Sequence, residues 1–169
     1  MKTILVTGGA GYIGSVAVKM LLDNGNSVIV VDNLNKGKKE LVDSRAKFHQ
    51  FDLVDKDALK KLFSSNKIDS IIHFAAYKAV EESMSNAVKY SDNITSTINL
   101  LNLAVEFKVN KFVFSSSAAV YGDSSDVLDE ESLTNPVNFY GFSKLECEKL
   151  IEWYGKIYGL SYICLRYFN

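Results

Sequence analysis

Short runs of apolar residues alternate, from one end of the chain to the other, with longer stretches in which apolar residues recur at helical spacing. Most of the short runs are continuously apolar and rich in Val, Ile and Phe, a pattern typical of strands that are covered on both faces of a sheet. The pattern predicts six strands, at Thr3–Thr7, Val28–Val31, Lys47–Phe51, Ser70–Phe74, Lys111–Ser115 and Ser161–Leu165.

The stretches between these runs predict helices. One face of the first helix carries Ile13, Ala17, Met20 and Leu21, and one face of a long helix near residues 86–108 carries Ile94, Ile98, Leu101 and Val105. A further helix, from about Asn138 to Tyr158, carries Leu150, Tyr154 and Ile157 in one stripe. The alternation of strand and helix predicts an α/β fold, a doubly wound parallel sheet (Rossmann fold) with strand order 3-2-1-4-5-6 and helices on both faces.

The length of 169 residues is enough for one domain, and no linker divides the chain, so we expect residues 1–169 to fold as a unit. Asp123–Asn138 is the longest stretch without periodicity and contains the only proline, Pro136. A loop of this length inside a compact domain is usually functional. It follows the fifth strand, on the side where open α/β sheets bind ligands.

Composition excludes several classes of protein. With 47% hydrophobic and 23% charged residues and a net charge of −1, the chain has no basic surface for nucleic acid or an anionic membrane. No apolar run approaches the roughly 20 residues that span a bilayer, and MKTILVTGG predicts a first strand, so we expect a cytoplasmic protein. The two cysteines, Cys147 and Cys164, predict structural thiols without a disulfide or metal site.

The segment TGGAGYIG follows the first strand and opens the first helix. Gly8, Gly11 and Gly14 are spaced so that the backbone can turn tightly and approach a pyrophosphate at the helix N-terminus, while Gly14 lets the helix pack closely on the sheet. A glycine-rich turn that binds nothing has the same composition, but the strand-loop-helix context is the one that dinucleotide binding requires.

Asp32 ends the second strand, eighteen residues beyond Gly14. A carboxylate near this spacing accepts hydrogen bonds from the adenosine ribose and repels a 2′-phosphate, which favours NAD over NADP. The nearby Lys36, Lys38 and Lys39 weaken that preference, unless they form a solvated charge run. Asp52, in FDL after the third strand, either approaches the adenine or caps the strand end.

The segment FYGFSK places Tyr140 and Lys144 four residues apart, on one helix face. A free tyrosine has a pKa of about 10, and an ammonium beside the phenol together with a positively charged nicotinamide would lower it, which makes Tyr140 a general base. Ser117, just past the fifth strand, could bridge Tyr140 and a substrate hydroxyl. A surface Tyr–Lys pair and a serine-rich loop are the alternatives if each motif stands alone.

Six segments together resemble the N-terminal part of an extended short-chain dehydrogenase/reductase, and within it the UDP-glucose 4-epimerase family. They are VTGGAGYIGS, VVDNL, IIHFAAYKAV, KFVFSSSAAVYGD, YGFSK and LRYFN, and they span the whole chain in the family's order. The resemblance implies that residues 1–169 are the NAD-binding Rossmann domain, with the C-terminal sugar-nucleotide domain absent.

The resemblance also assigns site residues. It places Ser117, Tyr140 and Lys144 as the catalytic trio, with Ser117, Tyr140 and Asn169 contacting the UDP-sugar substrate. Cofactor positions, together with Gly14, Tyr140 and Lys144, are Gly8, Gly11, Tyr12, Ile13, Asp32, Asn33, Asp52, Leu53, Phe74, Ala75, Ala76, Lys78, Asn93, Ser115 and Tyr167. Three positions depart from the family pattern, Val16, Glu81 and Phe139, and they touch packing or loop shape more than chemistry.

The implied reaction is epimerisation at C4 of a UDP-hexose, by transient hydride transfer through a 4-keto intermediate with NAD regenerated in each cycle. This would make the protein an isomerase of galactose and carbohydrate metabolism. Ala118 and Ala119, after Ser117, argue against a dehydratase, which needs carboxyl groups there. Another NAD-dependent sugar-nucleotide epimerase or reductase, or a non-catalytic NAD-binding fragment, remains open.

The resemblance further implies a homodimer through the helices near 86–108 and 138–158. Ile98, Leu101 and Val105 would serve that interface, although an apolar helical stripe is more often intramolecular core. Because too little of the family's chain is present to hold UDP, we expect the isolated chain to have low or no activity.

Overall fold

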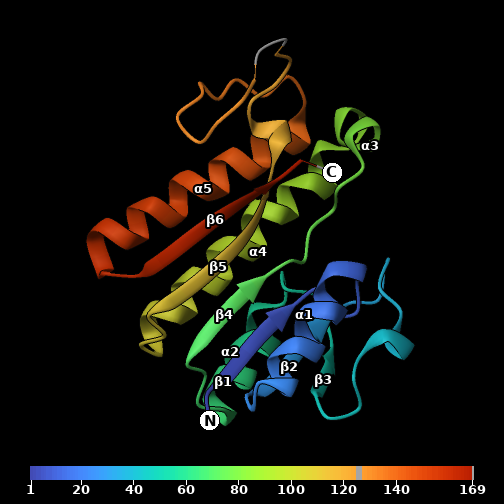
Figure 1. The fold of residues 1–169 in the computed structure, drawn as a ribbon, viewed down its shortest axis with the longest axis vertical. Coiled ribbons are helices and arrows are strands. Elements are labelled where there is room, and N and C mark those ends of the chain that lie inside the picture. The colour runs from blue at the N-terminus through green and yellow to red at the C-terminus, as the bar shows by residue number, and fades with distance from the viewer. Residues whose placement is uncertain (125–126, 169) are drawn as a thin grey trace.

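The computed structural model describes residues 1–124 and 127–168. Six parallel strands form one sheet in the order β3-β2-β1-β4-β5-β6, as the sequence predicts (Figure 1). The strands are β1 (Thr3–Thr7), β2 (Ser27–Asp32), β3 (Lys47–Gln50), β4 (Ser70–His73), β5 (Lys111–Ser117) and β6 (Ser161–Tyr167). Their carboxyl ends meet at one edge, where the order reverses between β1 and β4.

Within the described residues, five α-helices and two short 3₁₀ turns connect the strands. They are α1 (Tyr12–Asp23), η1 (Lys39–Leu41), α2 (Lys56–Ser65), α3 (Val80–Ser85), α4 (Ala87–Glu106), η2 (Ala118–Val120) and α5 (Phe139–Tyr158). Side chains of Asp55, Asn86 and Asn138 cap α2, α4 and α5, and Gly159 ends α5 in a left-handed conformation. The short α3 was not predicted, because six residues carry no helical periodicity.

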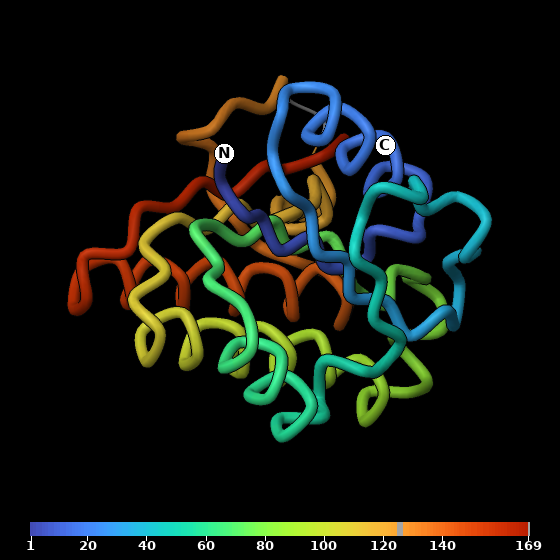
Figure 2. Tube along the Cα trace, turned by 90° about the horizontal axis from the view of Figure 1, so that it is seen from below, coloured from blue at the N-terminus to red at the C-terminus, as the bar shows by residue number. Residues whose placement is uncertain are grey.

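The helices cover the sheet from both sides, which confirms the doubly wound arrangement (Figure 2). Helices α2, α4 and α5 pack on one face around Leu5, Ile71 and Phe112. Helix α1 packs on the other face, where Val18 meets Val30. Each face of the inner strands is therefore buried, which explains their continuous apolar runs.

Two predicted helix stripes are rotated relative to the buried faces. In α1 the side chains of Ile13 and Met20 are 43% and 60% exposed, whereas Val18 is fully buried. In α5 Ile157 is 63% exposed, whereas Cys147 and Ile151 lie in the core and the predicted Leu150 and Tyr154 pack against it while partly buried. Each predicted stripe therefore contains residues that do not face the sheet.

One of the three residues of α4 that were predicted to lie in a dimer interface does not reach the surface. Leu101 is fully buried in the core of its own chain, so its side chain cannot contact a partner. Ile98 and Val105 are half-buried.

The helices do not cover the sheet completely at its β6 edge, where Ile163 is 51% exposed.

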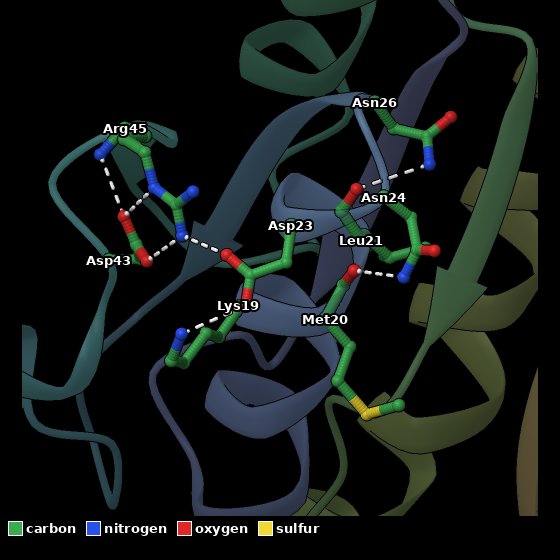
Figure 3. A network of polar contacts seen from close by, with 8 residues as sticks. All are labelled: Lys19, Met20, Leu21, Asp23, Asn24, Asn26, Asp43 and Arg45. Atoms are coloured by element: carbon green, nitrogen blue, oxygen red, sulfur yellow. Dashed lines mark hydrogen bonds and ion pairs between the residues drawn. The ribbon is translucent and has the colours of Figure 1, made fainter.

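A surface network ties the end of α1 to the segment between β2 and β3 (Figure 3). Arg45 donates to Asp43 at 2.6 Å and to Asp23 at 2.8 Å, and Lys19 donates to Asp23 at 2.8 Å. Lys19, Arg45 and Asp23 are about half exposed or more and only Asp43 is mostly covered, at 19% exposure, so we expect these ion pairs to contribute little to stability.

Among the described residues, no helix is long and apolar enough to cross a membrane. The thiols of Cys147 and Cys164 are free, and Cys147 is buried in the core. Within residues 1–124 and 127–168, no cluster of three or more His, Cys, Asp or Glu side chains could hold a metal ion.

Candidate functional site

The glycine turn is shaped by backbone contacts that leave no room for side chains. Gly8 has φ +72°, and a Cβ there would lie 2.6 Å from the backbone nitrogen of Ala75, at the end of β4. A Cβ on Gly14 would collide with the carbonyl of Gly8. Gly14 thus permits the helix to approach the turn itself, and not the sheet as predicted. Gly9, which sequence reasoning did not select, makes the sheet approach, because a Cβ there would press on Val30.

The N-terminus of α1 is open to an anion. Gly11 is the N-cap and provides no side-chain hydrogen bond, and the first turn contains no acidic residue. Tyr12 and Ile13 begin the helix with exposed side chains, so their backbone N–H groups are what they offer to a ligand. The backbone amides and the helix dipole together suit a phosphate group.

Asp32 lies at the end of β2 and faces this turn. Its Oδ2 accepts from the Ala10 amide at 3.0 Å and its Oδ1 from the Leu34 amide at 2.9 Å. Leu34 has φ +61°, an uncommon conformation that bends the chain around the carboxylate. Each oxygen keeps a lone pair, so the fixed carboxylate can still accept ribose hydroxyls.

Asn33 and Asp52 are held together at the next position along the edge. The Asn33 side-chain amide donates to Asp52 Oδ2 at 2.7 Å, while Asp52 Oδ1 accepts from the Val54 amide at 3.1 Å. Asp52 therefore does cap the residues after β3, and it also faces Asn33. Leu53 beside it is buried.

The segment that follows β4 passes beside the glycine turn. Phe74 donates its amide to the Thr7 carbonyl at 3.0 Å, which keeps Ala75 next to Gly8, and Ala76 follows in the same half-buried segment. Asn93 of α4 grips the same segment, because its side chain bonds to both the amide and the carbonyl of Tyr77, at 2.9 and 3.0 Å. The Asn93 side chain thus holds the backbone of this segment. Lys78 is exposed.

Tyr140 lies in the first turn of α5, and two elements fix that turn. The Asn138 side chain accepts from the Gly141 amide at 2.8 Å, and Ser83 of α3 accepts from the Tyr140 amide at 3.1 Å. Ser117, at the end of β5, lies close enough to the Tyr140 side chain to lower the pKa of its phenol. The structure therefore brings together two members of the predicted trio.

Lys144 lies one turn further along α5 and is only 3% exposed. Its ammonium donates to the Ser115 carbonyl at 2.7 Å, and it lies 4.7 Å from the Phe114 ring centroid and 6.0 Å from the Tyr140 ring centroid. Burial lowers the pKa of Lys144 to about 8, although the nearby Cys147 and Glu148 counteract part of this shift. The third member of the trio is thus in place, facing the tyrosine ring.

The expected fall in the pKa of Tyr140 is not found. Burial raises the pKa of this phenol above its ordinary value, and Ser117 offsets only part of the shift. The Lys144 ammonium donates to the Ser115 carbonyl and lies 6.0 Å from the Tyr140 ring centroid, and its charge does not outweigh the loss of solvent around the phenol. The protein's own residues therefore leave Tyr140 protonated at neutral pH.

A buried histidine lies behind the site. His73 ends β4 and is hydrogen-bonded through Nδ1 to the Thr7 hydroxyl at 2.7 Å and through Nε2 to the Thr97 hydroxyl at 3.2 Å. Complete burial lowers the pKa of His73 to about 3, with a smaller contribution from the charge of Lys144. A neutral imidazole thus joins β1, β4 and α4 beneath the crevice.

The remaining predicted residues lie at the same edge or outside the description. Tyr167 is the register partner of Ser117 in the β5–β6 pair, so it flanks that serine. Asn169, the expected substrate contact, lies outside the described residues. Sequence reasoning missed Ser83 and Glu148, whose partners are distant in the sequence.

Comparison with known proteins agrees with this geometry. Residues 4–169 match the NAD dependent epimerase/dehydratase family. The chain is 49% identical over 169 residues to UDP-glucose 4-epimerase of Lacticaseibacillus casei, covering 99% of this chain and 51% of that protein. The chain spans about half the length of the curated relatives it matches.

Solved structures give the same answer. A crystal structure of UDP-glucose 4-epimerase superimposes with a TM-score of 0.96 at 46% identity, covering 99% of this chain and 52% of that one. The Brucella ovis UDP-glucose 4-epimerase in complex with NAD gives 0.95 at 37% identity, covering 100% and 52%. By sequence over nearly its whole length, and by fold, this chain belongs to the NAD-dependent epimerase/dehydratase family.

Proposed function

We propose that the chain is the cofactor-binding half of a UDP-hexose 4-epimerase that uses NAD. The observation that carries the proposal is the meeting of Tyr140, Ser117 and Lys144 at the carboxyl edge of the sheet, where the glycine turn also lies. The family supports the redox cofactor, and the names of the relatives support UDP-glucose and UDP-galactose as substrates.

The residues present fit a dinucleotide. The turn around Gly8 keeps a bare backbone against Ala75, and the uncapped N-terminus of α1 offers amides for the pyrophosphate. Asp32 offers a fixed carboxylate for the ribose hydroxyls, and its negative charge disfavours the 2′-phosphate of NADP. NAD, when bound, supplies a positively charged hydride acceptor for C4 of the sugar.

In this proposal Tyr140 removes the proton of the 4-hydroxyl, and Ser117 holds that hydroxyl by hydrogen bonding. Because burial raises the pKa of Tyr140, the base requires a positive charge beyond that of Lys144. Lys144 also fixes the end of β5 through the Ser115 carbonyl, which keeps Ser117 against the tyrosine. The same trio suits alcohol oxidation in general, so the epimerase assignment depends on the relatives.

We further propose that the isolated chain has low or no turnover. It spans about half of each relative, and the exposed Ile163 at the β6 edge is consistent with a further segment packing there. Another sugar nucleotide, or cofactor binding without catalysis, is the alternative reading. A homodimer through α4 and α5 would involve Ile98 and Val105 but not the buried Leu101.

The test has two parts, made on this chain. Calorimetric titration with NAD and with NADP is expected to show tighter binding of NAD, and a coupled assay with UDP-galactose is expected to show little or no UDP-glucose. Absence of binding to either nucleotide would contradict the cofactor assignment. Robust turnover would contradict the expectation of low activity, and NAD binding without turnover fits both the fragment and the non-catalytic module. A fusion of this chain with the half of a relative that it does not cover separates these two readings, because turnover by the fusion is expected only for a catalytic fragment.

A further inference from the structure

Three consecutive residues at the end of β5 are each held by α5. Ser117 lies beside the Tyr140 phenol and lowers its pKa, and the Ser115 carbonyl accepts from Lys144. The hydroxyl of Ser116, between them, donates to the carboxylate of Glu148. Residues 140, 144 and 148 are spaced by one helical turn and share one face of α5, so this face is matched residue by residue to the strand end.

Glu148 also reaches the neighbouring strand. Arg166 of β6 donates through Nε to both carboxylate oxygens, at 3.1 and 3.3 Å, and through Nη2 at 2.7 Å. Ser116 and Arg166 are register partners, so one carboxylate joins α5, β5 and β6 at the same level. Arg166 in turn donates to the Tyr121 hydroxyl at 2.8 Å, in the segment after Ser117.

The ion pair between Glu148 and Arg166 is too deeply buried to be explained by a gain in stability. Glu148 is 9% exposed, and an ion pair at such depth is weak evidence for stability because desolvation offsets the attraction. Its hydrogen bonds are directional, however, and they fix where α5 lies along β5. A slip of α5 by one residue moves each side chain by about 1.5 Å along the axis, enough to break a hydrogen bond.

We propose that Glu148 is a positioning residue that, through its bond with Ser116, sets the register of α5 on β5 and thereby keeps the Tyr140 phenol near Ser117, while Arg166 balances the charge of its carboxylate. The inference rests on the proposed function only in treating Tyr140 and Ser117 as the reacting pair. The contact itself can be measured without nucleotide or turnover, so a failure of NAD binding and a failure of this inference are distinguishable.

The test compares two double variants of this chain by NMR, with labelled tyrosine and Tyr140 assigned through Y140F. In E148M/R166M the carboxylate and the guanidinium are replaced by apolar groups of similar length, so no bond to Ser116 remains. In E148Q/R166M the amide oxygen can still accept from Ser116. We expect the first variant to lose the nuclear Overhauser contact between the Tyr140 ring and the Ser117 methylene, and the second to retain it.

The pKa of Tyr140 gives a second readout. Ser117 lowers that pKa, so loss of its contact in E148M/R166M should raise the pKa of Tyr140 relative to E148Q/R166M. A folded E148M/R166M with the wild-type contact and pKa would overturn the inference and leave the pair a purely structural role.

Two further variants keep the comparison decisive. If E148M/R166M does not fold, S116A introduced into E148Q/R166M removes the same bond with the loss of one hydroxyl, and the contact should then weaken; an unchanged contact counts against the inference. E146Q is the matched control, since Glu146 lies on the same helix in a partly exposed pair with Lys149. It should leave the Tyr140 signals unchanged.

Discussion

Replacement of Lys144 by methionine should stabilise the protein at neutral pH. Burial lowers the pKa of Lys144 from 10.5 to about 8, so the charged form is disfavoured in the folded chain. At about 1.4 kcal/mol per unit, the folded state bears a cost of about 3 kcal/mol at pH 7. The bond from Lys144 to the Ser115 carbonyl returns about 1 kcal/mol, which leaves a net gain of about 2 kcal/mol for K144M.

The stability advantage of K144M should depend on pH in a direction that follows from the lowered pKa of Lys144. Between about pH 8 and 10.5 the unfolded chain still binds the lysine proton while the folded chain has released it, so wild-type stability rises with pH in this window. K144M has no lysine proton at this position, so its stability does not rise in this way. The advantage of K144M should therefore shrink by roughly 2 kcal/mol between pH 7 and pH 9.5.

Urea unfolding followed by circular dichroism at the two pH values measures both quantities. K149M is the matched control, because Lys149 lies on the same helix with an exposed side chain paired to Glu146. It should change the free energy of unfolding by no more than about 0.5 kcal/mol at either pH. A K144M variant that is less stable than wild type at pH 7, or whose advantage does not vary with pH, would refute the reasoning about burial.

Three further predictions concern other parts of the molecule. H73Q should reduce the loss of stability on acidification. His73 has a folded pKa of about 3, so its neutral form in the folded wild type should cost about 2 kcal/mol of unfolding free energy between pH 7 and pH 5, and H73Q should not show this loss when both are unfolded in urea. D32N should weaken NAD binding at least about tenfold and narrow the preference over NADP, measured by calorimetry; equal affinity for NAD would contradict the role of the carboxylate. R45A should leave the urea midpoint unchanged within error, since Arg45 and its partner Asp23 are each about half exposed. A large fall in the midpoint would show that the network of Figure 3 is structural.

The strands could be predicted because burial on both faces leaves a direct mark on the sequence. Thr3–Thr7 was predicted with its observed bounds, and the other five strands begin or end within two residues of their predictions. The helix faces were less predictable. Both α1 and α5 expose apolar residues such as Met20 and Ile157, so their apolar stripes are wider than their buried faces.

The candidate site likewise has features that the sequence predicts and features that it does not. Residues at strand ends, such as Asp32 and Ser117, were predictable because a parallel sheet brings its carboxyl ends to one edge. The direction of the Tyr140 pKa shift was not, because it depends on how deeply the ring is buried. The pairing of Glu148 with Arg166 was not predictable either, since it requires the register of α5, β5 and β6 together.

The central claim is that Tyr140 becomes a base only when a second positive charge joins that of Lys144. The most direct measurement is the pKa of Tyr140 by NMR, with labelled tyrosine, in the chain alone and saturated with NAD. The account predicts a pKa above the ordinary 10 in the chain alone and a clear fall of that pKa when NAD binds. A pKa that is already low without NAD, or that does not fall when NAD binds, would contradict it.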